Sequence, residues 1–150
     1  MSSQLATTQS ILLLSFDRWL DLNEYEGLLN LQVGPWELQA RTILNPREWD
    51  ALHPGQSLSG EVYLQAYRDA EPTKQPPGWV QEDGVNYSVT GMIAAHSGDD
   101  LTLALPGGTV RVDLDGHALN AVVNEVVTIR GEVDFETEDS HFETGSSTPG

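Results

Sequence analysis

The sequence predicts an all-β protein, in which a small Greek-key barrel forms the second half and a β-rich first half packs against it or repeats it. Three observations predict this class. Alternation of apolar and polar residues with a period of two dominates the chain, which is typical of half-buried strands. Glycine, proline, asparagine and aspartate separate the alternating segments as turn residues. No long segment has the period of an amphipathic helix.

The first half, residues 10–68, is expected to contain four strands. In the second of them, Leu29, Leu31 and Val33 face inward. Gly34–Pro35 then forms a tight turn, because proline presets φ and glycine accepts a positive φ. The expected strands are 11–16, 28–33, 36–42 and 57–67, and the side chains expected to share a face in the other three are Leu12, Leu14 and Phe16, then Trp36, Leu38 and Ala40, then Leu58, Val62, Leu64 and Ala66.

Residues 45–52, NPREWDAL, predict one or two helical turns. Asn45 is a good N-cap, Pro46 suits the first helical position, and Glu48 lies where a capping box requires a glutamate. Pro-Gly at 54–55 ends the segment. We expect Trp49, like Trp36, to belong to the core.

Residues 69–84, DAEPTKQPPGWVQEDG, interrupt the alternation. Three prolines and two glycines, with little apolar content, predict a Pro/Gly-rich loop or a linker. A structureless loop of this length is uncommon inside a compact domain, so the segment is either functional or a boundary.

The second half, residues 85–136, alternates more regularly. Residues 116–124 are expected to be an irregular or short helical connection. From Thr137 the chain has too little apolar surface to offset the entropy of ordering, so 137–150 is expected to be a disordered acidic tail, and 1–9 a flexible N-terminus. The expected strands are 87–95, 101–105, 109–114 and 125–136, with inward side chains Leu101, Leu103, Leu105, Val110, Val112, Leu114, Val127, Ile129, Val133 and Phe135.

A Gly-Glu-Val tripeptide occurs in the last strand of each half, at 60–62 and 131–133. The echo predicts a weak internal duplication. Chance is the alternative, because a glycine inside a strand often marks a bend or bulge wherever a barrel closes.

The second half resembles the small bacterial barrels of the OB-fold class over about residues 85–136. A strand ending in a Gly-containing stretch (VTGMIAA) is followed by a hairpin (DDLTLALPGGTVRVDLDG), a connection and a closing strand (VTIRGEVDF). This is a pattern of spacing rather than a signature motif. The resemblance implies a binding scaffold that engages its ligand on one barrel face and the flanking loops.

The charge balance is strongly acidic. Twenty-three acids face seven bases, which gives a formal net charge of −16. A field of this sign repels phosphate backbones, so we expect no nucleic-acid partner. The six-residue apolar run 11–16 is too short for a signal peptide or a membrane span, and no cysteine is present. We therefore expect a cytoplasmic protein without a membrane partner.

Two acidic turns are candidate metal sites. HSGDD (96–100) and DLDGH (113–117) lie on either side of the strands at 101–105 and 109–114, and they could share a cation if both turns lie at one end of the barrel. DLDGH does not fit a calcium loop of the EF-hand type, because glycine stands at its fourth position. An Asp-Gly turn at the end of a strand is the simpler interpretation. The candidate ligands are His96, Asp99, Asp100, Asp113 and Asp115.

No motif indicates catalysis. No serine lies in a G-x-S-x-G elbow, and LPGGTV (105–110) lacks the lysine and the helix of a phosphate-binding loop. We expect no enzyme activity and no cofactor.

Aromatic side chains next to acids suggest an interaction surface. Period two places Tyr63 and Tyr67 on the outer face of strand 57–67, and Trp79 lies among prolines, where it either contacts a partner or folds back over the barrel. The candidate partner-binding residues are Tyr63, Tyr67, Trp79, Glu82 and Asp83.

The sequence favours a non-catalytic acidic interaction module, such as an inhibitor, an immunity-type protein or an adaptor, that engages a basic protein partner. The alternative is a barrel that binds a small ligand or a divalent cation. Homo-oligomerisation through strand edges stays open.

Overall fold

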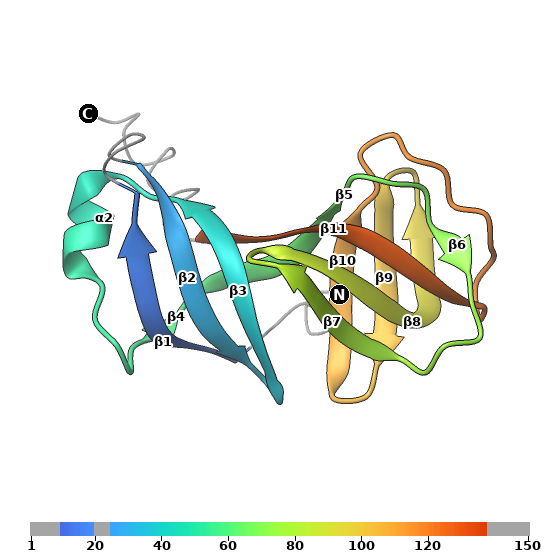
Figure 1. Cartoon of the computed structure of the whole chain (residues 1–150), viewed down its shortest axis with the longest axis horizontal. Coiled ribbons are helices and arrows are strands. Elements are labelled where there is room, and N and C mark those ends of the chain that lie inside the picture. The colour runs from blue at the N-terminus through green and yellow to red at the C-terminus, as the bar shows by residue number, and fades with distance from the viewer. Residues whose placement is uncertain (1–9, 20–24, 138–150) are drawn as a thin grey trace. The chain divides into compact units, whose positions relative to one another are not determined.

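The computed structural model describes residues 10–19 and 25–137, which form strands and one short helix (Figure 1). The predicted all-β class is confirmed. The flexible N-terminus predicted for 1–9 and residues 138–150 of the predicted disordered tail lie outside the described residues, whereas Thr137 ends the last strand. The elements are β1 (Ile11–Arg18), β2 (Glu26–Val33), β3 (Trp36–Ile43), α2 (Pro46–Ala51), β4 (Ser57–Leu58), β5 (Gly60–Ala66), β6 (Glu71–Pro72), β7 (Gly78–Asp83), β8 (Asn86–Ser97), β9 (Asp100–Leu105), β10 (Gly108–Asp113) and β11 (Val126–Thr137).

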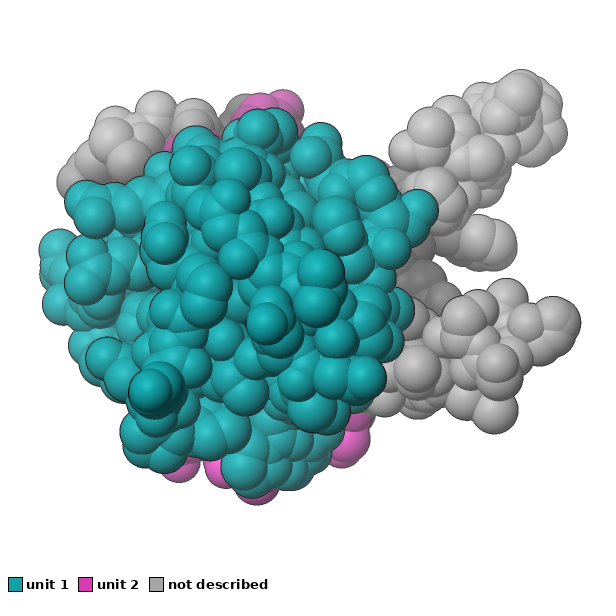
Figure 2. Space-filling model, turned by 90° about the vertical axis from the view of Figure 1, so that its right-hand side faces the viewer, with its two compact units in different colours: residues 1–7, 63–134 teal, residues 8–62, 135–150 magenta. Residues whose placement is uncertain are grey.

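The chain divides into two compact units, coloured separately in Figure 2. Of the described residues, unit 1 contains 63–134, and unit 2 contains 10–19, 25–62 and 135–137. The division therefore falls inside β5 and inside β11 rather than at the predicted linker 69–84. That segment itself holds β6 and β7, so it is not a structureless loop.

Unit 1 is a closed five-stranded barrel. β8, β9 and β10 form an antiparallel meander, and β10 then pairs in parallel with β5 through Val112 and Leu64. β5 lies next to β11, and β11 pairs antiparallel with β8, which closes the barrel. The arrangement is consistent with the predicted OB-like barrel. One of its strands, β5, comes from the predicted first half.

The core of unit 1 follows the predicted alternation. The inward side chains predicted for 101–105, 109–114 and the part of 125–136 that belongs to this unit are buried. Residues 116–124 form an irregular connection without helix, as predicted. The buried apolar side chains of this unit are Leu64, Ala66, Ala70, Tyr87, Val89, Ile93, Leu101, Leu103, Leu105, Val110, Val112, Leu114, Val127, Ile129 and Val133.

Unit 2 uses the same order of strands. β1, β2 and β3 form an antiparallel meander, and the end of β11 lies between β3 and β5. β4 is separated from β5 by one residue, Ser59, and it pairs with β1. The order of strands in unit 2 therefore leads back to its first strand, β1. In both units the first strand therefore pairs with the fourth, and the fifth lies between the third and the fourth.

Two strands, β5 and β11, each belong in part to both units. β5 begins in the fourth strand of unit 2 and continues as the fifth strand of unit 1, and β11 begins as the fourth strand of unit 1 and continues as the fifth strand of unit 2. Gly60 and Gly131 of the two Gly-Glu-Val tripeptides both lie in fourth strands. This repeated topology supports the predicted internal duplication.

Both glycines are required by close backbone contacts. A Cβ at Gly131 would overlap the carbonyl oxygen of Gln65 in unit 1, and a Cβ at Gly60 would overlap that of Glu136 in unit 2. Glycine is the residue that permits such an approach between strands. The two positions thus keep β5 and β11 paired within each unit.

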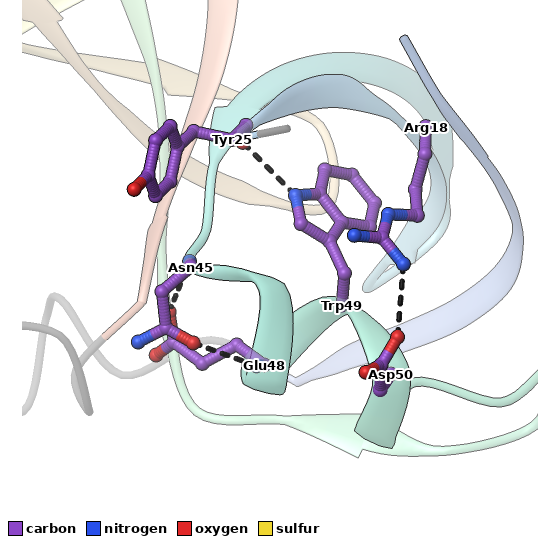
Figure 3. Close-up of polar contacts among 6 residues, drawn as sticks. All are labelled: Arg18, Tyr25, Asn45, Glu48, Trp49 and Asp50. Carbon is purple, nitrogen blue, oxygen red and sulfur yellow. Dashed lines mark hydrogen bonds and ion pairs between the residues drawn. The ribbon is translucent and has the colours of Figure 1, made fainter. Parts of the chain in front are cut away.

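Helix α2 is fixed in unit 2 by its cap and its tryptophan (Figure 3). Asn45 Oδ1 accepts from Glu48 N at 2.8 Å, and Glu48 Oε1 accepts from Asn45 N at 2.9 Å, so the predicted capping box is confirmed. Trp49 is buried, as predicted, and its Nε1 donates to Tyr25 O at 2.9 Å. Arg18 lies over the Trp49 ring at 5.8 Å and pairs with Asp50 at 2.9 Å.

Two predictions for unit 2 need correction. Trp36 is only half-buried at the start of β3, because it follows the Gly34–Pro35 turn at the strand end. In β1 the buried residues are Ile11 and Leu13, whereas Leu12 and Leu14 are each 37% exposed. A register shift between Leu13 and Ser15 interrupts the period-two pattern there. A bulge of this kind is not visible in a run of apolar residues.

We predict that Gly131→Ala lowers the free energy of unfolding by about 1–3 kcal/mol, because the added methyl group overpacks the contact with Gln65. Gly98→Ala serves as the control. Its methyl group meets nothing within 4 Å, and only its φ of 61° opposes the substitution. Urea denaturation measures both; equal losses in the two variants would contradict the close-contact explanation.

Candidate interaction surface

Two turns meet at one end of the barrel of unit 1. The turn between β8 and β9 contains Gly98 and Asp99, and the second turn follows β10. Asp99 connects them twice: its carbonyl oxygen accepts from Leu114 N at 2.8 Å, and its Oδ1 accepts from Gly116 N at 3.1 Å. HSGDD and DLDGH are thus joined by direct hydrogen bonds.

The second turn is held by its own aspartates. Asp113 Oδ1 accepts from Asp115 N at 2.9 Å, and Asp115 adopts a φ of 50°. Aspartate tolerates this left-handed conformation better than most residues, because its short side chain bonds to nearby backbone. VRVDLDGH is therefore a strand that ends in an Asp-Gly turn, as the sequence suggests.

Two further aspartates stand beside these turns. Asp100 at the start of β9 lies 3.8 Å from the guanidinium of Arg111, which itself lies 4.8 Å over the ring of Tyr63. Asp69 Oδ1 accepts from Ala118 N at 2.9 Å and lies 3.4 Å from His117 Nδ1. We call Asp69, Asp99, Asp100, Asp113 and Asp115 the acidic rim.

The acidic rim includes four of the five predicted metal ligands. The fifth, His96, places its Nε2 2.8 Å from Gly98 O within its own turn. Asp99 and Asp113 already bond to backbone N–H groups of the second turn. Within residues 10–19 and 25–137 no three His, Asp or Glu side chains are grouped so that they could hold a metal ion. Carboxylates in this arrangement organise the turns.

Two of the predicted partner-binding residues, Trp79 and Tyr63, are half-buried. Trp79 is half-buried and packs edge-on against buried Tyr87, at 5.7 Å between ring centroids and 85° between planes. Tyr63 is half-buried beneath Arg111. Trp79 thus turns toward the barrel, which is one of the two orientations that the sequence left open.

Tyr67 and Glu82 each contact Arg130, one through its backbone and the other through its side chain. Tyr67, 42% exposed, donates its backbone N–H to Arg130 O at 3.1 Å, and Glu82 Oε2 lies 3.3 Å from Arg130 Nε. Asp83 ends β7 at the surface. Sequence reasoning missed Val80, which is 61% exposed between Trp79 and Gln81. The signal available was period two, because an inward Trp79 requires an outward Val80.

Unit 2 contains a pocket that sequence reasoning also missed. Its volume is about 200 Å³, which is below the range of about 300–1,000 Å³ that is usual for small-molecule sites. No local motif could have indicated it, because its walls come from distant segments. The lining residues are Leu29, Leu44, Glu48, Ala51, Leu52, Gln56, Ser57, Leu58, Ser59, Phe135 and Thr137.

Comparison with known proteins adds no relative to this description. No family model matches the sequence, and no curated protein or solved structure matches it either. Within the described residues no helix has the length and apolar character needed to cross a membrane. Function is therefore argued from the side chains of the two units.

We predict that millimolar calcium or magnesium leaves the midpoint of thermal unfolding unchanged, because Asp99 and Asp113 already bond to the backbone. A concentration series of each chloride salt, with sodium chloride at matched ionic strength, measures the midpoint. A rise with calcium that Asp113→Asn abolishes would restore the cation-binding interpretation.

Proposed function

We propose that this chain is a non-catalytic interaction module that binds a basic protein partner through the acidic rim of unit 1. The observation that carries the proposal is the gathering of five carboxylates at one end of a closed barrel. A second layer of support comes from the charge of the whole unit.

Acids outnumber bases in unit 1. Residues 63–134 contain eleven acids and four bases, and two of the bases, Arg111 and Arg130, already pair with Asp100 and Glu82. The unit therefore presents a negative field beyond its internal ion pairs. The eleven acids are Asp69, Glu71, Glu82, Asp83, Asp99, Asp100, Asp113, Asp115, Glu125, Glu132 and Asp134.

The rim is organised before any partner arrives. Asp69, Asp99 and Asp113 each accept a backbone N–H, so these side chains lose little conformational freedom on binding. Asp115 lies exposed beside them, on a turn in which Asp115 and Gly116 adopt positive φ angles of 50° and 82°. Carboxylates in fixed positions suit the guanidinium and ammonium groups of arginine and lysine.

Such a surface acts mainly through long-range attraction. Opposite charge on a partner speeds encounter and selects among partners, and it contributes less to the depth of the final affinity. Binding should weaken as salt rises, because exposed charges are screened over about 10 Å at 0.1 M ionic strength. The absence of cysteine is compatible with the cytoplasmic setting that we propose.

The test is capture of partners from the lysate of the protein's own cells, with mass spectrometry of the retained proteins at low and physiological salt. Two double variants remove the same charge at different places. Asp100→Asn with Asp115→Asn removes two of the five rim charges, and Asp17→Asn with Glu37→Gln removes two exposed charges of unit 2.

We predict that wild type and the unit 2 variant retain a basic protein at low salt, that the rim variant binds it several-fold to about tenfold more weakly, and that raised salt releases it. The retained protein is then titrated to give the dissociation constants. Equal affinity of the two double variants, or retention that ignores salt, would contradict the proposal.

A further inference from the structure

We infer that the turn at 122–125 is an apolar contact point of unit 1, which packs against an apolar patch bordered by lysine or arginine on the partner. The inference rests on the proposed function, because it takes the same basic partner. It adds the short-range part of the interface and states which side chains lie between the basic groups of the partner.

Two neighbouring valines of this turn are exposed. Val122 is 67% exposed and Val123 is 48% exposed. Turns usually carry glycine, proline, asparagine, aspartate or serine, so the turn itself does not require two β-branched apolar side chains. A single exposed apolar residue is normal on a protein surface, whereas these two are adjacent in the chain. The pair therefore needs an explanation outside the turn.

Hydrogen bonds within the turn fix its shape. Glu125 N donates to Val122 O at 3.0 Å, and Glu125 Oε1 accepts from Val122 N at 2.9 Å. Asn124, the third residue, has a φ of 80°, which is the value of a type II turn at this position and which asparagine tolerates. The two valines thus lie on a closed turn.

The turn is also bonded to the barrel. Asn124 N donates to Ile93 O at 2.8 Å, and Ile93 N donates to Glu125 O at 2.9 Å. Ile93 is a fully buried residue of β8, so the anchor belongs to the core of unit 1. A contact point that is held in this way loses little conformational freedom when a partner binds.

The turn and the acidic rim fit within the area of one interface. The connection from β10 to β11 (Figure 1) begins at the rim and passes Ala118, whose N–H donates to Asp69 Oδ1 at 2.9 Å. Val122 follows four residues later, which is at most about 14 Å of chain. An interface of standard size, about 800 Å² on each side, is roughly 30 Å across. One partner can therefore contact the rim and the valines together.

The charges around the turn define the border of the partner's apolar patch. Glu125 closes the turn, and Glu71, exposed in β6, pairs with Thr128 near the start of β11. No lysine or arginine occurs in the sequence between Arg111 and Arg130. Apolar side chains against the valines, with bases around them, complement this arrangement.

A second copy of this chain fits the same surface poorly. It would bring a formal charge of −16 against an equal charge. Contact between two copies of the turn would also place acid next to acid. Charge complementarity thus favours a basic partner over self-association.

The apolar and charged parts of such an interface respond differently to salt. Dissolved ions screen the attraction between exposed charges. The gain from removing apolar surface from water does not depend on charge. Affinities measured at two salt concentrations therefore separate the contribution of the valines from that of the rim.

Two synthetic peptides of about 18 residues are the probes. The leucine peptide has leucines at helical spacing, so that its helix carries an apolar face bordered by lysines. The serine peptide has the same lysines, with serine in place of every leucine. The full chain is titrated with each peptide at low and at physiological salt, which gives the dissociation constants.

Three variants of the full chain are compared with wild type. Val122→Ser removes an apolar side chain from the turn. Val80→Ser is the matched control, because it removes a valine of similar exposure, 61% against 67%, from β7 of the same unit. Asp100→Asn with Asp115→Asn removes two rim charges. Urea denaturation establishes that each variant is folded.

We expect Val122→Ser to bind the leucine peptide about tenfold more weakly than wild type at both salt concentrations, whereas Val80→Ser binds it like wild type. The rim variant should also bind it more weakly, but this loss should shrink as salt rises. The serine peptide should bind wild type more weakly than the leucine peptide does, and Val122→Ser should not change its affinity.

Equal affinity of wild type and Val122→Ser for the leucine peptide would overturn the apolar contact point, and a weaker rim variant would then leave the proposed function standing. Equal affinity of wild type and the rim variant would contradict the proposed function and, with it, the basic border of the inferred patch.

Two further outcomes would also overturn the inference. One is that wild type binds neither peptide, in which case lysate capture decides the proposed function separately. The other is self-association of the chain in analytical ultracentrifugation that Val122→Ser abolishes, which would assign the turn to a second copy.

Discussion

The pairing of β5 with β11 is the constraint on which both units depend. Each of these strands contributes to the fourth strand of one unit and to the fifth strand of the other, so the barrel of unit 1 and the sheet of unit 2 both need the two strands. The pairing needs glycine at 60 and 131, because any Cβ there would overlap the backbone of the opposite strand. The glycine of each Gly-Glu-Val tripeptide therefore has a packing reason.

Closure of unit 1 brings carboxylate groups together at one end of the barrel. The β8–β9–β10 meander brings the turn at Asp99 next to the turn at Asp115, and hydrogen bonds from backbone N–H groups orient the carboxylates there. In an OB-like barrel with a fourth and fifth strand in sequence, a loop between them would flank the binding face. Here β11 runs on into unit 2 instead, so no such loop follows the fourth strand of unit 1.

Local patterns in the sequence predicted local structure well. Strict alternation fixed the buried faces of 28–33, 101–105 and 109–114, and the capping box at Asn45 marked the helix start to the residue. The sharing of β5 and β11 between the units was not predictable, because the partner of β5 is chosen by tertiary closure across about 65 residues of chain. Likewise, proline and glycine in 69–84 indicated a loop, whereas pairing with β8 makes part of it a strand. At the candidate sites, period two placed Asp113 and Asp115 on the solvent face, whereas the hydrogen bonds that join their turn to Asp99 depend on the closed barrel. The exposure of Val80 depends on the inward orientation of Trp79, which the sequence left open.

The acids of unit 1 serve folding and recognition together, and this double role favours a protein partner over a bound cation. A cation would have to replace the backbone N–H groups that Asp99 and Asp113 already accept, at the cost of the turns themselves. A lysine or arginine side chain needs only the remaining lone pairs, because a carboxylate offers about four acceptor positions. The same carboxylates can therefore keep the turns in place and attract a basic surface.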